Sequence, residues 1–228
     1  MTMLTLAGED ADFAEARRLM VLGQITPNAV SDPLLVQAMG EVPRERFVPP
    51  GMRHRAYADA PVPLGGERAM MNPMVLGRLL QALAPQPGER ALVLGAGTGY
   101  GAAVLGRMGL DVTAIESDAR LVELGRVALE VMRHEDEPNL KHANPIHGWP
   151  RGAPFRLILI EGSVARVPAE IWTQLSEGGR AATVVQGDSP IGKATLFRRA
   201  GGTVTETVVF DAAAPRLPEF QGAAGFVF

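Results

Sequence analysis

The stretch Leu94–Gly101 reads LGAGTGYG and directly follows the apolar run Ala91–Val93. An apolar run that ends in alternating glycines is typical of a strand followed by a tight loop and then a helix. Glycine allows positive φ angles and lets a ligand approach the backbone closely. The loop therefore predicts a nucleotide-like ligand at the carboxyl end of the strand, and a tight turn without a ligand is the less favoured interpretation.

Two glycine patterns fit this loop, and they correspond to different cofactors. Gly97–Ala102 matches GxGxxA, the fingerprint of dinucleotide binding, whereas Gly95–Gly99 matches GxGxG, the form used for S-adenosylmethionine. Glu116 ends the next apolar run, where a carboxylate can accept hydrogen bonds from the ribose hydroxyls of either cofactor. About ninety residues precede the loop, whereas dinucleotide folds often begin with the glycine strand. This position favours a methyltransferase over a nicotinamide-dependent oxidoreductase.

The composition describes an ordinary globular chain and excludes several classes of function. Of the 228 residues, 46% are hydrophobic and 21% are charged, which suffices for one large core. The formal net charge of −3 argues against a nucleic-acid partner. The chain has no cysteine and its four histidines lack the spacing of a helical metal site, so we expect no metal. The N-terminal residues contain no basic leader and no apolar stretch reaches membrane length, which predicts a cytoplasmic protein without a membrane partner.

The pattern of apolar residues changes near residue 90. Before it, Asp32-Pro33 and Asn72-Pro73 predict helix starts, each followed by an apolar stripe at helical spacing. After it, strands alternate with helices, which predicts an α/β fold with a mostly parallel sheet and an antiparallel edge. The expected strands are Ala91–Leu94, Val112–Glu116, Leu140–Asn144, Phe155–Ile160, Arg180–Gln186, Ala194–Arg198 and Val204–Phe210, with helices after the glycine loop, from Asp118, and over Pro168–Leu175.

These patterns divide one domain into three parts. Residues 1–89 form a helical cap with a long connection, residues 90–210 form the cofactor-binding core, and residues 211–228 form a C-terminal tail. The connection Val42–Met71 is rich in proline and has no sustained period, so we expect an ordered loop that wraps the surface.

Aromatic residues indicate how the connection and the tail are held. Phe47 and Tyr57 are expected to anchor the connection. Phe220, Phe226 and Phe228 indicate that the tail docks on the domain or on a second copy of the chain in a homo-oligomer.

Five stretches of the chain together resemble one protein family. The stretches are VPRERFVP (Val42–Pro49), AYADAPVPLG (Ala56–Gly65), VLGAGTGY (Val93–Tyr100), GWPRGAPF (Gly148–Phe155) and QLSEGGR (Gln174–Arg180). In order and spacing they resemble the protein-L-isoaspartate O-methyltransferase family, from about Met20 to Gln186. The resemblance implies a Rossmann-like seven-stranded methyltransferase fold with an N-terminal helical cap and S-adenosylmethionine as cofactor. It also implies methylation of isoaspartyl carboxylates in damaged proteins or peptides, which starts their repair, while another carboxylate acceptor stays open.

The same resemblance implies which residues bind the cofactor. The loop glycines would cradle it, Glu116 would hold its ribose, and Asn144 stands beside the adenine, where the family usually has Asp. The predicted set is Gly95, Ala96, Gly97, Thr98, Gly99, Tyr100, Glu116, Ser117 and Asn144.

The cap departs from the family pattern. The family motif has the form GQTIS followed by any residue and Pro, and Glu67–Met71 occupies these positions here. Met71 therefore stands at the family's catalytic Ser position and Ala69 at its Thr position, so both hydroxyls are missing. Arg68 is the candidate for orienting the acceptor instead, because a guanidinium can grip a carboxylate bidentately; the catalytic residues are otherwise unknown. The alternative function is a cofactor-binding homologue that has lost isoaspartyl turnover.

Two further departures lie in the core. Val93 replaces the usual acidic residue of the first strand, and Glu161-Gly162-Ser163 replaces a small TAA-like run after the fourth strand. Methyl transfer to a carboxylate needs alignment and exclusion of water rather than a general base. We therefore expect these changes to affect acceptor recognition more than cofactor binding.

Overall fold

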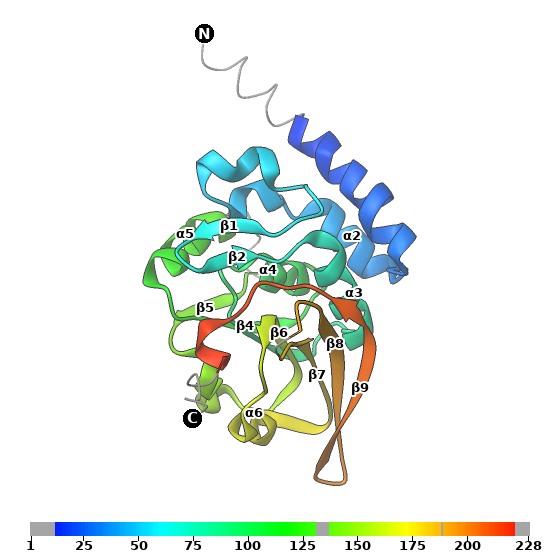
Figure 1. Ribbon diagram of the computed structural model, residues 1–228, viewed down its shortest axis with the longest axis vertical. Coiled ribbons are helices and arrows are strands. Elements are labelled where there is room, and N and C mark those ends of the chain that lie inside the picture. Colours follow the sequence, from blue (N-terminus) through cyan, green and yellow to red (C-terminus); the bar gives the residue numbers. More distant parts are fainter. Residues whose placement is uncertain (1–11, 131–136, 188, 222–228) are drawn as a thin grey trace.

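The computed structural model describes residues 12–130, 137–187 and 189–221 (Figure 1). A seven-stranded sheet with the order β5-β4-β3-β6-β7-β8-β9 forms its centre. The strands are β3 (Arg90–Leu94), β4 (Asp111–Glu116), β5 (Asn139–His142), β6 (Phe155–Val164), β7 (Leu175–Val185), β8 (Gly192–Ala200) and β9 (Thr203–Ala212). Neighbours from β5 to β7 are parallel, whereas β8 pairs antiparallel with both β7 and β9. The predicted α/β sheet with an antiparallel edge is confirmed.

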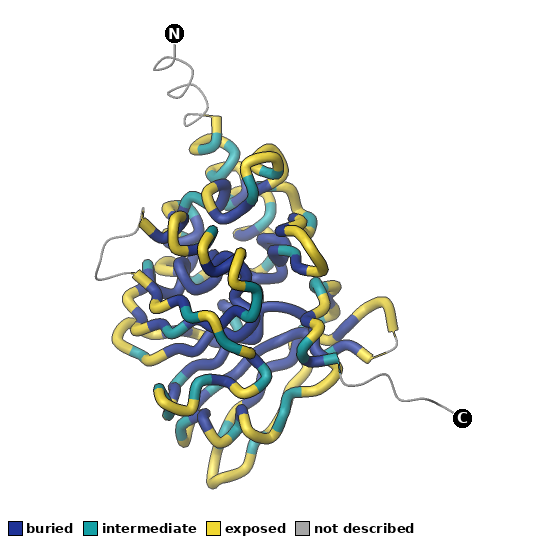
Figure 2. Tube along the Cα trace, turned by 90° about the vertical axis from the view of Figure 1, so that its left-hand side faces the viewer, coloured by how far each residue is buried: buried dark blue, intermediate teal, exposed yellow. Residues whose placement is uncertain are grey.

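Helices cover both faces of this sheet, which explains why its central strands are apolar throughout. Helix α4 (Tyr100–Arg107) follows β3, α5 (Ala119–Leu129) follows β4, and α6 (Ala169–Gln174) precedes β7. In β3, Leu92 packs into one hydrophobic cluster and Val93 into the other, because successive side chains of a strand point to opposite faces. Figure 2 shows the resulting band of buried backbone through the centre of the molecule.

The N-terminal cap is built from helices, as predicted. Residues 12–20 are helical, and α2 (Pro33–Glu41) and α3 (Pro73–Leu83) follow. The Asp32 carboxylate accepts hydrogen bonds from the backbone amides of Leu34 and Leu35 at 2.9 and 3.1 Å, and so caps α2. Asn72 stands before α3 but turns its side-chain amide to the Asp59 carboxylate at 3.1 Å.

The connection between α2 and α3 is more regular and more buried than we predicted. It contains two 3-10 turns, Arg44–Phe47 and Pro50–Arg55, and a hairpin of β1 (Val62–Gly65) and β2 (Arg68–Met70). The strands are too short to give a recognisable alternation in the sequence. Phe47 is fully buried, so this predicted anchor is confirmed. The connection is ordered, as predicted, but it is not a loop throughout, and several of its residues are buried.

Several predicted boundaries also differ from the structure. Strand β5 ends at His142, so Asn144 lies beyond it and its side chain caps a short 3-10 turn, Pro145–His147. Strand β6 runs to Val164, four residues beyond the predicted end, because Ser163 and Val164 continue to pair with β7 after an irregularity in the register. Strand β7 begins at Leu175, where the prediction had placed the end of a helix.

Residues 213–221, here called the C-terminal strap, cross the end of the sheet that faces the β1–β2 hairpin (Figure 1). The Ser163 amide donates to the Pro215 carbonyl at 2.7 Å, and the Leu217 amide donates to the Ser163 carbonyl at 3.0 Å. Phe220 is buried against the second hydrophobic cluster, whereas Phe226 and Phe228 lie outside the described residues. Part of the predicted tail therefore docks on the domain.

Within the residues that the structure describes, we find no helix long and apolar enough to cross a membrane.

Candidate active site

The glycine loop lies where β3 separates the two halves of the sheet. Strand β3 has β4 on one side and β6 on the other, and loops at such a switch point open toward the carboxyl ends of the strands. Gly95, Gly97 and Gly99 have φ angles of 67°, 57° and 88°, which only glycine adopts readily. The Ala96 amide donates to the Ile115 carbonyl at 3.1 Å and so ties the loop to β4.

Glu116 is the centre of a dense hydrogen-bond network at the end of β4. Its side chain is fully buried. Its Oε2 accepts from the Gly97 amide at 2.7 Å, and its Oε1 accepts from the backbone amides of Ser117 and Asp118 at 2.9 and 3.0 Å. The carboxylate therefore fixes both the glycine loop and the turn before α5.

Arg68 reaches this carboxylate from the hairpin. Its Nη2 lies 2.5 Å from Glu116 Oε2, and its Nη1 lies 3.5 Å from Glu219 Oε2 of the strap. The Arg68 side chain is only 9% exposed. The structure thus places the predicted acceptor-orienting guanidinium on the carboxylate predicted to hold the ribose, a contact that no sequence pattern indicates.

Other predicted cofactor residues are partly used by the protein itself. Thr98 is buried, and its hydroxyl donates to the Phe47 carbonyl of the cap. The Ser117 hydroxyl donates to the Glu219 carboxylate. Asn144 accepts from the Ile146 amide at 3.1 Å, which leaves its NH₂ group for other contacts.

The two cap residues that replace hydroxyls lie in different surroundings. Met71 is 1% exposed and belongs to the main hydrophobic cluster, which fits a packing role for this methionine. Ala69, on β2, lines two cavities at once.

The smaller cavity, about 10 Å³, lies between the hairpin and the glycine loop, and we call it the inner cavity. It has room for about one water molecule. Its lining residues are Leu64, Ala69, Met70, Gly95, Ala96, Gly97, Thr98, Tyr100 and Glu161. Five of the nine predicted cofactor residues line the inner cavity, and a sixth, Gly99, belongs to the loop that borders it. Glu116 contacts this loop by accepting a hydrogen bond from the Gly97 amide.

Two buried polar side chains, Tyr100 and Glu161, line the inner cavity. Within the described ranges, Glu161 Oε2 has no hydrogen-bond partner. The Arg44 guanidinium lies over the Tyr100 ring, 4.6 Å from its centre. Burial raises the pKa of Glu161 to about 8, against the opposing effects of Arg44 and Arg68. The sequence singled out Glu161 only as a departure from a pattern, because its burial depends on the packing of β6 against β3 and α4.

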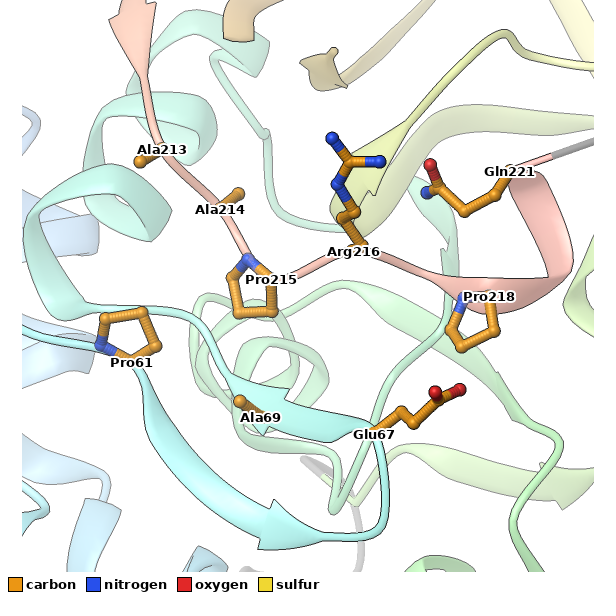
Figure 3. Close-up of a pocket in the computed structure, with 9 residues that line it drawn as sticks. All are labelled: Pro61, Glu67, Ala69, Ala213, Ala214, Pro215, Arg216, Pro218 and Gln221. Carbon is orange, nitrogen blue, oxygen red and sulfur yellow. The ribbon is translucent and has the colours of Figure 1, made fainter. Parts of the chain in front are cut away.

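The larger cavity is a groove of about 600 Å³ between the hairpin and the strap, here called the outer groove (Figure 3). Its walls are mainly apolar: Pro61 and Ala69 face Pro215 and Pro218, with Glu67 at one end. Ala69 lines both cavities, so the outer groove and the inner cavity border the same residue of β2.

Among the described residues, we find no group of three or more histidine, aspartate or glutamate side chains that could hold a metal ion.

Comparisons with known proteins identify relatives over most of the chain. The model of the family described as Protein-L-isoaspartate(D-aspartate) O-methyltransferase (PCMT) matches residues 17–212. A protein-L-isoaspartate O-methyltransferase from Methylorubrum extorquens (strain PA1) is 39% identical over 187 residues, covering 82% of this chain and 80% of that protein. A protein of the same name from Gloeobacter violaceus is 31% identical and covers 84% of this chain and 93% of the relative.

Solved structures share the fold. A protein-L-isoaspartate O-methyltransferase has a TM-score of 0.76 at 23% identity, covering 90% of this chain and 67% of that chain. A β-aspartate methyltransferase from Plasmodium falciparum, solved in complex with S-adenosyl-L-homocysteine, has a TM-score of 0.73 at 20% identity and covers 87% and 97% of the two chains. At these identities the likeness concerns the fold alone.

Proposed function

The chain belongs to the protein-L-isoaspartate(D-aspartate) O-methyltransferase family, and we propose that it methylates isoaspartyl carboxylates of proteins or peptides with S-adenosylmethionine through the site described above. The observation that carries this assignment to the site is the glycine loop beside a buried carboxylate at the switch point of the sheet. The family assignment confirms the predicted resemblance, enzyme class and cofactor. The comparisons give no support to the alternative in which turnover has been lost.

The residues at the switch point fit this cofactor chemically. Gly95 and Gly97 offer backbone without side chains, and Glu116 offers a buried carboxylate that suits ribose hydroxyl donors. Glu116 Oε2 already accepts from Gly97 and Arg68, so we infer that ribose hydroxyls replace the Arg68 guanidinium on this oxygen. The Asn144 side chain lies just beyond β5, at the position that we propose for the adenine.

When bound, S-adenosylmethionine supplies an electrophilic methyl group, and the sulfur keeps the electron pair of the bond that breaks. The protein's contribution is to position the acceptor and to exclude water, because a carboxylate at neutral pH is already a nucleophile. We place the acceptor's approach in the outer groove, since its walls are mainly apolar and Ala69 lines both this groove and the inner cavity. The hairpin and the strap would close over the reacting groups.

Several expectations stay predictions. These are the cytoplasmic location, assembly into a homo-oligomer, and an acceptor other than an isoaspartyl carboxylate. The roles of the individual cofactor-binding residues are likewise proposals of this article.

A matched pair of peptides tests the proposed function. The purified chain would be incubated with S-adenosylmethionine labelled in the methyl group and with a peptide that contains either isoaspartate or aspartate at one position. We expect label to enter the isoaspartyl peptide and to be released by mild base, as from a methyl ester. Equal labelling of both peptides, or label that resists base, would contradict the assignment.

A further inference from the structure

The carboxyl group of Glu161 is a buried polar group that the proposed site does not yet use. Glu161 follows Ile160 in β6, and Ile160 pairs with Leu94 of β3, so Glu161 lies beside the first glycine of the loop. The side chain is 6% exposed, and within the described residues its Oε2 has no hydrogen-bond partner. A buried oxygen of this kind needs an explanation, because leaving it unpaired costs free energy.

The neighbouring helix is shaped to admit this carboxyl group. A Cβ atom on Gly101, in the first turn of α4, would lie only 2.4 Å from Glu161 Oε2. Real Cβ atoms do not approach an oxygen so closely, so any other residue at this position would displace the carboxyl group. The fourth glycine of the opening stretch thus makes room for Glu161 rather than for a loop conformation.

Burial favours the protonated form of Glu161. Burial raises the pKa of this carboxyl group against the guanidinium groups of Arg44 and Arg68, which lower it; Glu116 adds to the rise, and the Gly101 amide opposes it. Tyr100, whose ring lies under the Arg44 guanidinium, also lines the inner cavity. Because the pKa lies at about 8, the group carries its proton at neutral pH and has an O–H to donate.

The position of Glu161 in the inner cavity indicates which group of a bound substrate it can contact. It shares this cavity with Ala69, which carries no donor and also lines the outer groove. A carboxylate that arrives along the outer groove would reach Ala69, which also borders the inner cavity. Because the inner cavity has room for about one water molecule, one oxygen of the carboxylate would enter it. There it would meet a buried O–H donor and the positive potential of the Arg44 guanidinium, which is in range to act on Glu161 electrostatically.

We propose that Glu161 orients the acceptor carboxylate by donating a hydrogen bond from its neutral carboxyl group, in the absence of hydroxyls at residues 69 and 71. This inference rests on the proposed function. One acceptor oxygen takes the hydrogen bond while the other receives the methyl group. Glu161 keeps its proton throughout, so it positions the acceptor and does not act as a base.

This role differs from binding the positively charged ammonium group of the cofactor. A cation needs the ionised form of Glu161, whereas an incoming anion favours the neutral form that burial already stabilises. The two roles have opposite consequences when the carboxyl group is changed to an amide. An amide keeps a donor for a carboxylate but offers a cation only a neutral carbonyl.

The experiment compares the parent chain with Glu161→Gln and Glu161→Leu between pH 6 and 9.5. Initial rates would be measured with an isoaspartyl peptide at saturating S-adenosylmethionine. Calorimetry would measure the affinity for S-adenosylhomocysteine, and for the peptide in its presence. Glu206→Gln makes the same chemical change on the exposed face of β9 and serves as the matched control. Circular dichroism at each pH would establish that every variant is folded.

We expect the parent's KM for the peptide to rise about tenfold per pH unit above pH 8, as Glu161 loses its proton. The KM of Glu161→Gln should not rise with pH. Its KM for the peptide should therefore be higher than the parent's at pH 7 and lower than the parent's at pH 9.5. Glu161→Leu should raise the peptide KM roughly 10- to 100-fold at pH 7, since a hydrogen bond to a charged group is lost. Affinity for S-adenosylhomocysteine should change by less than about threefold in both variants, and Glu206→Gln should follow the parent.

The possible outcomes separate this inference from the proposed function. Peptide methylation with the same pH dependence in the parent and in Glu161→Gln would overturn the role of Glu161 alone. A marked loss of S-adenosylhomocysteine affinity in Glu161→Gln would assign Glu161 to the cofactor and also overturn it. Peptide that binds with the expected pH dependence but is not methylated would contradict the proposed function alone. Peptide that neither binds to the parent nor is methylated would overturn both.

Discussion

Two buried glutamates flank the glycine strand, and their surroundings are opposite. Glu116 ends β4 and accepts hydrogen bonds from three backbone amides and from Arg68. Glu161 lies on β6, on the other side of β3, and within the described ranges one of its oxygens has no partner. The same side chain therefore serves as a fixed organiser of the loop in one place and as a neutral group with an O–H to offer in the other.

The difference comes from the backbone around each carboxyl group. The turn after β4 directs successive N–H groups at Glu116, so that both of its carboxyl oxygens accept hydrogen bonds. Around Glu161 the helix side chain is absent, since position 101 is glycine, and burial dominates. A site with one saturated and one unsatisfied carboxyl group can hold a cofactor and an acceptor through different chemistry.

The largest expected effect comes from removing the carboxyl group of Glu116, whose oxygens are saturated with hydrogen bonds. Glu116→Ala should weaken binding of S-adenosylhomocysteine by about 2–4 kcal/mol, because two buried charge-assisted hydrogen bonds to the ribose are lost. It should also lower the free energy of unfolding by roughly 3–5 kcal/mol, since Arg68 is left buried without its main partner. Calorimetry and denaturant unfolding measure the two effects.

A conservative variant separates these contributions. Glu116→Gln keeps the shape of the side chain and should weaken cofactor binding while losing less stability than Glu116→Ala. Undiminished affinity for S-adenosylhomocysteine in Glu116→Ala would show that the ribose binds elsewhere.

The second prediction concerns stability on the unsatisfied side. The pKa of Glu161 is raised in the folded chain from an ordinary 4.5 to about 8. Between these values the unfolded chain gives up the proton and the folded chain keeps it, so this group makes the parent less stable as pH rises. Below the pKa of the unfolded chain Glu161 does not lower the stability, and above the pKa of the folded chain the loss of stability is complete. The side chain in Glu161→Gln does not titrate. The free energy of unfolding of this variant, relative to that of the parent, should therefore increase by on the order of 3 kcal/mol when the pH is raised from 5 to 8.

Denaturant unfolding of the two proteins at four or five pH values measures this gain. The slope of unfolding with denaturant should stay equal in both, which excludes a change in the unfolded state. A difference in stability that does not vary with pH would mean that Glu161 is ionised in the folded chain, and the contrast between the two glutamates would fail.

The two regions also differ in how far the sequence predicts them. The glycine loop and Glu116 could be predicted because an apolar run, a glycine spacing and an acid at the next strand end are local signals. The Arg68–Glu116 pair joins residues 48 positions apart, and its hairpin strands are too short to show a period. The neutral state of Glu161 depends on the approach of β6, α4 and the cap, and no local pattern carries that information.

The third prediction tests whether Arg68 acts as a partner of Glu116 or binds the acceptor carboxylate. In the structure its guanidinium takes a place on Glu116 that ribose hydroxyls would need. Arg68→Met should therefore tighten binding of S-adenosylhomocysteine about tenfold, or roughly 1.4 kcal/mol, by removing this competitor. Arg53→Met, on an exposed 3-10 turn of the cap, is the matched control.

The sequence-based interpretation of Arg68 gives a different result in the same experiment. If the guanidinium grips the acceptor carboxylate, Arg68→Met should raise the peptide KM and leave the cofactor affinity unchanged. Measuring both quantities on one preparation decides between the two roles.

The smallest expected effect is that of a change at Asn144, in the loop after β5. The Asn144 side-chain oxygen caps the turn Pro145–His147 by accepting from the Ile146 amide at 3.1 Å. Aspartate can make the same cap, and its second oxygen could accept from the adenine amino group, so Asn144→Asp should improve affinity for S-adenosylhomocysteine by less than about 1 kcal/mol. Calorimetry at pH 7.5 measures the change, with Asn139→Asp at the exposed start of β5 as the control for added negative charge. A large loss of affinity specific to Asn144→Asp would mean that its NH₂ group donates to the cofactor, and that this loop binds the adenine through a donor where the family usually presents an acid.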